Sequence, residues 1–208
     1  MFKVIKVLSI PATPHIFICR HGHTALNEAA GTPDKIRGWV DVPLNDEGRK
    51  DAEEARKTLL ANTTKVDKIY VSNLSRTIET ASIINQKFNA PTVETESLRP
   101  WNLGELQGQE TKGVMPVMEM FVDHPDSIVP KGESFNTFKN RYLSFLKEVI
   151  KEAKTKDLTL LLVTHFRNVK MAQAWIAEGM KDDLSVDGDI MSTNDCSPGD
   201  IFELPIKY

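Results

Sequence analysis

The stretch CRHGHT at residues 19–24 gathers several side chains that do chemistry in enzymes. A cysteine or a histidine can attack phosphorus as a nucleophile. Two histidines two positions apart can share a metal ion, and an arginine can bind the oxygens of an anion through its fork of N–H groups. The stretch is therefore compatible with a cysteine nucleophile, a metal site, or a histidine that reacts with a phosphate itself.

The cysteine and metal hypotheses both lack a partner in the sequence. A cysteine phosphatase needs an arginine six positions after its cysteine, and the sixth residue after Cys19 is Ala25. Cys19 also ends an apolar, β-rich run, so we expect a core thiol. A pair formed by His21 and His23 would suit metal-dependent hydrolases, but their barrel needs about 250 residues, and no later His/Asp cluster completes a site. We expect no metal, which favours a histidine nucleophile.

Segments typical of strands and helices alternate along the chain, and they must position these residues. Strands are expected at 15–19, 67–72, 91–94, 157–165 and 199–206, and helices at 46–61, 73–88, 114–122 (short), 133–154 and 168–179. This alternation predicts an α/β fold with three α/β/α layers around a mostly parallel sheet. With 208 residues, we expect a single domain over 1–208.

The ends of three predicted strands carry the polar residues. Ligands of such sheets bind outside the carboxyl ends of the strands, and those ends precede Arg20-His21, Ser75-Arg76 and His165. One such histidine or arginine alone is usually structural, but two of each at one edge form a positive pocket suited to a tetrahedral dianion. One ring nitrogen of a histidine nucleophile must be unprotonated and the other held by a hydrogen bond. Gly22 is expected to let the backbone approach the ligand closely.

The motifs resemble those of the histidine phosphatase superfamily, the phosphoglycerate-mutase-like proteins. CRHGHTALN matches R-H-G-x-T-x-x-N, and RGWVDVPLNDEGRKDA matches G-x-x-D-x-P-L-x-x-x-G. IYVSNLSRTIETA matches S-x-L-x-R-x-x-x-T-A, PKGES also fits, and LLVTH ends in the second histidine. The segments cover most of residues 15–170 in the expected order.

The resemblance implies a phosphoglycerate-mutase-like fold and a role for each matching residue. His21 would be the nucleophile that becomes phosphohistidine. The residues that bind the phosphoryl group would be Arg20, Arg76 and His165, with Asn27 as a further ligand and Thr24 supporting the loop. No metal or other cofactor is implied.

The chain departs from the family at the usual proton donor, a glutamate in a stretch like L-R-E-x-x-x-G. Here the stretch reads LRPWNLGELQG, and Pro100 occupies the position of the glutamate. The leaving group must then be protonated from elsewhere, react slowly, or need no acid. Glu105 is the nearest carboxyl group and our candidate donor. Three further titratable residues lie in segments that could fold over the pocket: Asp123, His124 and Glu133.

A second departure follows the second histidine, where the family often has glycine and this chain has Phe166-Arg167. The Phe166 ring could wall the pocket. Arg167 could reach a second anionic group on a substrate, or it could be a surface arginine at a helix start. Together with residues 105–134, which we interpret as a substrate-specificity insertion, this pair is expected to set specificity.

Composition limits the partners. A net charge of -3 gives no broad positive field for nucleic acid, and no apolar run approaches the ~20 residues that span a bilayer. Two cysteines, Cys19 and Cys196, indicate a reducing cytoplasm, and Lys6 interrupts the only stretch that faintly resembles a signal peptide. We expect a cytoplasmic protein with a small phosphorylated substrate, no membrane partner, and a homodimer left open.

The function expected from these observations is metal-independent hydrolysis of phosphate monoesters through phosphohistidine on His21, weakened by the loss of the acid at Pro100. One competing hypothesis is a cofactor-dependent phosphoglycerate mutase. The short chain and the missing glutamate segment argue against it. Another is a pseudoenzyme that binds a phosphorylated ligand without efficient turnover.

Overall fold

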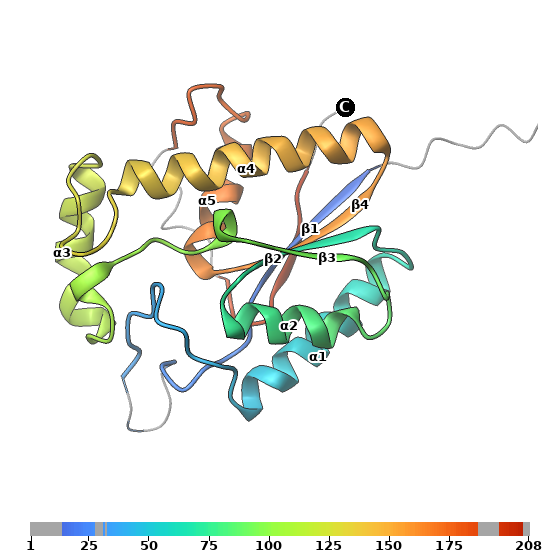
Figure 1. Ribbon diagram of the computed structural model, residues 1–208, viewed down its shortest axis with the longest axis horizontal. Helices are drawn as coiled ribbons and strands as arrows, with labels where there is room; N and C mark the ends of the chain where they lie inside the picture. Colours follow the sequence, from blue (N-terminus) through green and yellow to red (C-terminus); the bar gives the residue numbers. More distant parts are fainter. Residues whose placement is uncertain (1–13, 28–30, 32, 187–195, 206–208) are drawn as a thin grey trace, which may run out of the picture.

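The computed structural model describes residues 14–27, 31, 33–186 and 196–205. Five strands form one sheet in the order β3-β2-β4-β1-β5 (Figure 1). The strands are β1 (His15–Arg20), β2 (Lys68–Ser72), β3 (Thr92–Thr95), β4 (Thr159–Thr164) and β5 (Ile201–Glu203). The first four are parallel to their neighbours, and β5 is antiparallel to β1. The mostly parallel α/β sheet predicted from the sequence is confirmed.

Helices cover both faces of the sheet. α1 (Asp46–Asn62) and α2 (Ser75–Asn85) lie below it in Figure 1, and α4 (Phe135–Lys156) and α5 (Phe166–Ala177) lie above it. Successive residues of a strand point to opposite faces. Accordingly Ile16 and Ile18 of β1 pack in the apolar cluster of α4 and α5, whereas Phe17 and Cys19 pack in the cluster of α1 and α2. The three expected layers are present.

Several boundaries differ from those expected. α2 and α5 each begin directly after an extended N-cap residue, Leu74 and His165, and neither side chain accepts a hydrogen bond from the first turn of its helix. The helix expected at 114–122 is longer, α3 (Thr111–Asp123), and lies beside one end of α4 (Figure 1). Two short 3₁₀ helices precede it, η1 (Glu96–Leu98) and η2 (Gly104–Leu106). In the described ranges, no helix has the length and apolar character needed to cross a membrane.

The register of the central strands brings the predicted site residues together. Arg20 at the end of β1 pairs with Thr164 at the end of β4, and the backbone N–H of His21 donates to the carbonyl of Thr164 at 3.0 Å. β2 flanks β4 on the other side, with Val71 opposite Val163. His21, His165 and the residues after β2 therefore leave the sheet at the same edge.

Candidate active site

His21 and His165 lie side by side at the carboxyl edge of the sheet. Their ring centroids are 5.2 Å apart in an edge-to-face arrangement, and their exposed fractions are 2% and 3%. The Nδ1–H of His21 donates to the carbonyl of Gly22 at 2.7 Å. This bond places the ring proton on Nδ1 and leaves Nε2 with its lone pair. The ring of His21 thus meets the requirement stated for a histidine nucleophile.

Both histidines are held in the neutral form. Burial, and then the positive charges of Arg76, Arg20 and Arg37, lower the pKa of His21 well below its usual value. Burial, followed by Arg76 and His21, lowers the pKa of His165 in the same way. Desolvation and neighbouring positive charge both disfavour an imidazolium ion. Neither ring carries a proton on both nitrogens at neutral pH.

Arg20 and Arg76 supply buried positive charge beside the histidines. Arg20 donates through Nη1 to the carbonyl of Cys196, and Arg76 donates to the carbonyls of Val40 (2.9 Å) and Gly38 (2.8 Å). Burial lowers the pKa of Arg20 to about 10 and that of Arg76 to about 9, so both remain cationic at neutral pH. The backbone carbonyls hold the two guanidinium groups in place without neutralising their charge.

Three buried nitrogens around His21 have no hydrogen-bond partner among the described residues: Arg20 Nε, Arg76 Nε and His165 Nδ1. His165 is held from its other side, with Nε2 2.9 Å from the hydroxyl oxygen of Ser72. Buried polar atoms are nearly always paired in native proteins, so unpaired ones need an explanation. Three unpaired nitrogens beside a neutral histidine suit a ligand rich in acceptor oxygens, such as a phosphoryl group.

Arg37 and Ser72 belong to this site, although neither was given a role from the sequence. The side chain of Arg37 is 15% exposed and its Nη1 lies 3.2 Å from Asp34 Oδ1. Its charge lowers the pKa values of both histidines, of Arg20 and of Arg76. Both residues lie inside the quoted motifs, Arg37 before Gly38 and Ser72 at the end of a predicted strand. Their positions inside these motifs are the sequence signal that could have identified them as site residues.

Thr24 and Asn27 organise the loop after β1. The backbone N–H and the hydroxyl of Thr24 both donate to Asn27 Oδ1, at 2.8 and 3.1 Å. The backbone N–H of Asn27 in turn donates to the carbonyl of Thr24 at 3.1 Å. The supporting role expected of Thr24 therefore has a geometric basis, and the amide oxygen of Asn27 is occupied by the loop itself. A phosphoryl contact by Asn27 stays a prediction.

The glycine of the motif faces α1. A Cβ on Gly22 would lie 2.2 Å from the carbonyl oxygen of Gly48, so the loop and the helix could not keep this distance. The observed close approach is thus to α1, whereas the approach to a ligand that we expected is not tested. Next to it, His23 binds Asp51 of α1 through its backbone N–H (2.8 Å) and its Nδ1 (2.6 Å). These contacts anchor the loop that carries His21.

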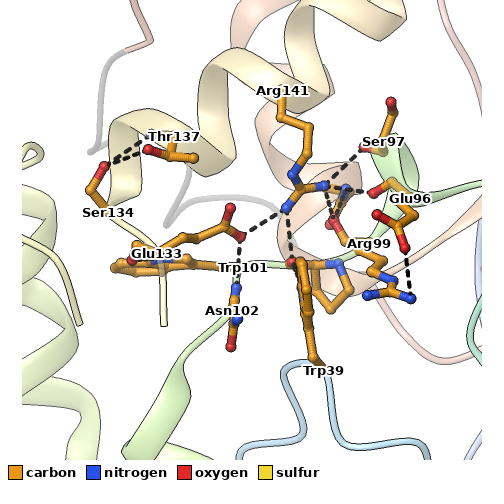
Figure 2. Close-up of polar contacts among 12 residues, drawn as sticks. Trp39, Glu96, Ser97, Arg99, Trp101, Asn102, Glu133, Ser134, Thr137 and Arg141 are labelled. Atoms are coloured by element: carbon orange, nitrogen blue, oxygen red, sulfur yellow. Dashed lines mark hydrogen bonds and ion pairs between the residues drawn. The ribbon is translucent and has the colours of Figure 1, made fainter. Parts of the chain in front are cut away.

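The segment around Pro100 is fixed by a network of arginines (Figure 2). Arg141 donates to the carbonyls of Glu96, Ser97, Arg99 and Pro100 at 2.9–3.3 Å. Its Nη2 also lies 2.8 Å from the carboxylate of Glu133. The indole N–H of Trp39 donates to the carbonyl of Pro100 at 2.8 Å, and the guanidinium of Arg99 lies 4.5 Å above the Trp39 ring. Pro100 therefore offers only a carbonyl, and that carbonyl is already hydrogen-bonded.

The carboxylates considered as proton donors are occupied or exposed. Glu105 is 53% exposed and ion-paired with Lys131 at 2.9 Å, and Glu133 accepts from Arg141 and from the backbone N–H of Asn102. Asp123 is the last residue of α3, and His124 is its C-cap. Both glutamates thus already have a cationic partner, Lys131 for Glu105 and Arg141 for Glu133. The proposed role of Glu105 remains a prediction without a contact that supports it.

The structure also bears on the cysteine and metal hypotheses for residues 19–24. Cys19 is fully buried in the cluster of α1 and α2, and burial raises the pKa of its thiol, as expected of a core cysteine. His21 and His23 bind different partners through Nδ1, Gly22 and Asp51. Among the residues that the structure describes, no group of three or more His, Cys, Asp or Glu side chains is placed to hold a metal ion.

Comparison with known proteins agrees with the motifs. The sequence model of the histidine phosphatase superfamily (branch 1) matches residues 16–186. Phosphoglycerate mutase-like protein 4 of Arabidopsis thaliana is 33% identical over 157 residues, covering 72% of this chain and 65% of that protein. The uncharacterized phosphatase PhoE of Bacillus subtilis (strain 168) is 29% identical over 150 residues, covering 72% of this chain and 70% of that protein. The chain thus spans about two thirds of the length of these relatives.

Solved structures share the fold over nearly the whole chain. YhfR of Bacillus stearothermophilus superposes with a TM-score of 0.72 at 25% identity, covering 91% of this chain and 89% of that one. The α-ribazole phosphatase of Shigella flexneri has a TM-score of 0.72 at 18% identity, covering 93% and 91%. A mycobacterial glucosyl-3-phosphoglycerate phosphatase in complex with VO3 has a TM-score of 0.68 at 19% identity, covering 92% of each chain.

Proposed function

Because this chain belongs to the histidine phosphatase superfamily, we propose that it hydrolyses phosphate monoesters through a phosphohistidine on His21. The observation that carries the proposal is the neutral, buried ring of His21, with Nδ1 tied to Gly22, beside the unpaired nitrogens of Arg20, Arg76 and His165 in the described part of the chain. That arrangement supplies a nucleophile and donors for the phosphoryl oxygens together. The named phosphatases among the similar proteins support the same reaction class.

In the first half of the reaction, Nε2 of His21 attacks phosphorus, the N–P bond forms, and the bond to the ester oxygen breaks. Arg20, Arg76 and Arg37 stabilise the negative charge of the phosphoryl oxygens, together with the Nδ1–H that His165 carries when the hydroxyl of Ser72 donates to its Nε2. Such pre-positioned donors supply most of the stabilisation in phosphoryl transfer. In the second half, water attacks phosphorus, the N–P bond breaks, phosphate leaves, and His21 returns to its neutral form.

The departing oxygen of an unactivated ester must take a proton, and we propose that solvent supplies it. Pro100 carries no acid, and both Glu105 and Glu133 are paired with cations. A positioned general acid contributes about 10²–10⁴ in rate. Its loss penalises esters with a basic leaving group and spares activated esters, whose leaving oxygen needs no proton. The proposal therefore includes a strong preference for good leaving groups.

The test measures turnover of an activated aryl phosphate and of an unactivated alkyl phosphate side by side. We expect the activated ester to be hydrolysed in the presence of EDTA, the alkyl ester to react at least about 10²-fold more slowly, and His21→Ala to abolish both activities. Activity that requires a divalent metal would overturn the proposal and return attention to the pair His21 and His23. If solvent is the donor, Glu105→Gln leaves the ratio of the two rates unchanged, whereas a slower alkyl ester in this variant would restore Glu105 as the donor.

A second candidate function is that of a protein that binds phosphate without turnover. The observation that favours it is Pro100, which carries no acid. It predicts that vanadate or phosphate binds while no ester is hydrolysed, including activated ones. A phosphoglycerate mutase is a further candidate, since mutases are among the similar proteins. It predicts that phosphoglycerates are interconverted much faster than they are hydrolysed.

We further propose that the protein is a cytoplasmic enzyme that acts on a small phosphorylated substrate. The location is supported by Cys19 and Cys196, which are both buried and both remain thiols. Neither a nucleic acid nor a membrane is proposed as partner, and a homodimer is left to a measurement of mass in solution.

A further inference from the structure

Arg167 is a partly buried arginine to which no described residue offers a carboxylate. It lies in the first turn of α5, two residues after His165. In the described segments of the chain, the one polar contact of its guanidinium is from Nη2 to the thioether sulfur of Met118 in α3, at 3.9 Å. A thioether is only a weak acceptor. The guanidinium therefore keeps most of its donor capacity.

Other arginines of this protein with a similar degree of burial are paired. Arg141 has the carboxylate of Glu133 and four backbone carbonyls, and Arg99 has Glu96 and Asn73. Arg167 stays partly exposed, so the N–H groups from which no described residue accepts are accessible to a ligand. Burial lowers the pKa of Arg167 to about 10, so the group is still charged at neutral pH. An anionic ligand that accepts hydrogen bonds from this guanidinium would explain why the chain carries an arginine at this position.

The position of Arg167 links it to the phosphoryl pocket through its neighbour. The ring of Phe166 lies 5.0 Å from the guanidinium carbon of Arg20, and the ammonium of Lys170 lies 5.0 Å from the same ring. Phe166, the first residue of α5, therefore contacts the phosphoryl-binding Arg20 directly, and Arg167 is the next residue of the same turn. Arg167 extends from that turn toward Met118 in α3, within the segment 105–134 that the sequence marked for specificity.

We propose that Arg167 binds a second anionic group of the substrate, a carboxylate or a second phosphate, separate from the transferred phosphoryl group. This inference rests on the proposed function, because the phosphoryl group must occupy the pocket of His21. The substrate class is thus a small molecule with a phosphoryl group at one end and another anion several bonds away. Arginine recognises both kinds of anion through the same bidentate geometry.

The experiment is a calorimetric titration of the full chain with phosphonates, which bind without being hydrolysed. Alkylphosphonates provide the reference, and ω-phosphonoalkanoates and bisphosphonates of graded chain length carry the second carboxylate or phosphate. We expect one chain length to bind about 10- to 100-fold more tightly than the alkylphosphonate of equal length, the gain of a charge-assisted, bidentate contact. The two anionic series distinguish a carboxylate from a phosphate.

Arg167→Gln should remove this gain and leave the affinity for the alkylphosphonate unchanged, whereas Arg56→Gln on α1 should keep both. Arg167→Met should not lower the Tm, because it replaces an unpaired charge by an apolar side chain of similar length. A gain that is absent from the wild type, or that survives in Arg167→Gln, would overturn the inference alone. If no phosphonate bound, the proposed function would fail as well.

Discussion

At the scale of single residues, the role of His21 depends on its being neutral, and burial together with the surrounding arginines keeps it so. Arg20, Arg76 and Arg37 attract a phosphoryl dianion, and the same charges lower the pKa of the nucleophile. One cluster thus performs two tasks, binding the substrate and keeping the lone pair on Nε2. Protonation of His21 would remove the lone pair, so the pKa of His21 sets the acid limit of activity.

The lowered pKa of His21 predicts the pH dependence of kcat/KM, which reports the free enzyme. With an activated aryl phosphate, and after correction for ionisation of the ester, kcat/KM should stay flat as pH falls through 6.5 and decline only well below it. Arg37→Met removes a positive charge that acts on His21, so the pKa of His21 should rise and the decline should move to higher pH. An acid limb at the ordinary pKa of histidine, unmoved in Arg37→Met, would contradict the assignment.

At the scale of elements, the loop after β1 is held against α1 by the contact between Gly22 and Gly48. From the sequence, Gly22 stood out, but its freedom was assigned to a ligand. The neighbour α1 could not be foreseen, because residues 22 and 48 meet only once the chain has folded. In contrast, the strand ends that carry His21 and His165 followed directly from the apolar runs, whose pattern is local.

The contact predicts a severe effect of Gly22→Ala. The added Cβ would lie 2.2 Å from a backbone carbonyl oxygen, so the loop or α1 must shift, at a cost of about 1–3 kcal/mol or more. We expect a lower Tm together with lost activity, because the shift displaces His21. Gly113→Ala in α3 is the matched control: its Cβ meets nothing within 4 Å, and alanine should stabilise the helix by about 0.5–1 kcal/mol. Equal effects of the two substitutions on activity would contradict this account.

The second element is the segment from η1 to Pro100, which Arg141 of α4 holds through four carbonyls and Glu133. Arg141→Met should lower the free energy of unfolding by about 1–3 kcal/mol, since it leaves Glu133 and the carbonyls without their donor. A double-mutant cycle with Glu133→Gln should give a coupling of about 0.5–3 kcal/mol. Lys131→Met breaks an exposed pair with Glu105 and should leave the free energy of unfolding close to that of the wild type. A coupling near zero would show that the Arg141–Glu133 pair contributes nothing to stability.

At the scale of the whole molecule, the three-layer fold assembles one site from residues far apart in the sequence. The parallel order of β1, β4 and β2 brings their carboxyl ends to one edge, as the alternation of strands and helices predicted, and Arg20, His21, Arg76 and His165 lie there. Arg37 was not foreseen, because a loop without periodicity gives no direction for its side chains. In the folded chain, Arg76 binds the carbonyls of Gly38 and Val40 in the same loop, and the charge of Arg37 acts on both histidines.

The net charge of -3 does not indicate that the chain has a positively charged site. Positive charge is gathered locally at Arg20, Arg37 and Arg76, while the rest of the chain carries an excess of acids. A compact cluster of this kind binds a small dianion without attracting a polyanion. The composition could therefore exclude nucleic acid as the expected partner, but only the folded chain reveals how many cations meet.

The most direct test of the central claim is chemical trapping of the phosphoenzyme. The full chain is mixed with an activated, isotopically labelled aryl phosphate, quenched in alkali within milliseconds to seconds, and digested for mass spectrometry. We predict label on the peptide that contains residue 21, stable to alkali and labile to acid as expected of phosphohistidine, and absent from His21→Ala. Hydrolysis without any labelled peptide, or label that persists in His21→Ala, would contradict the account.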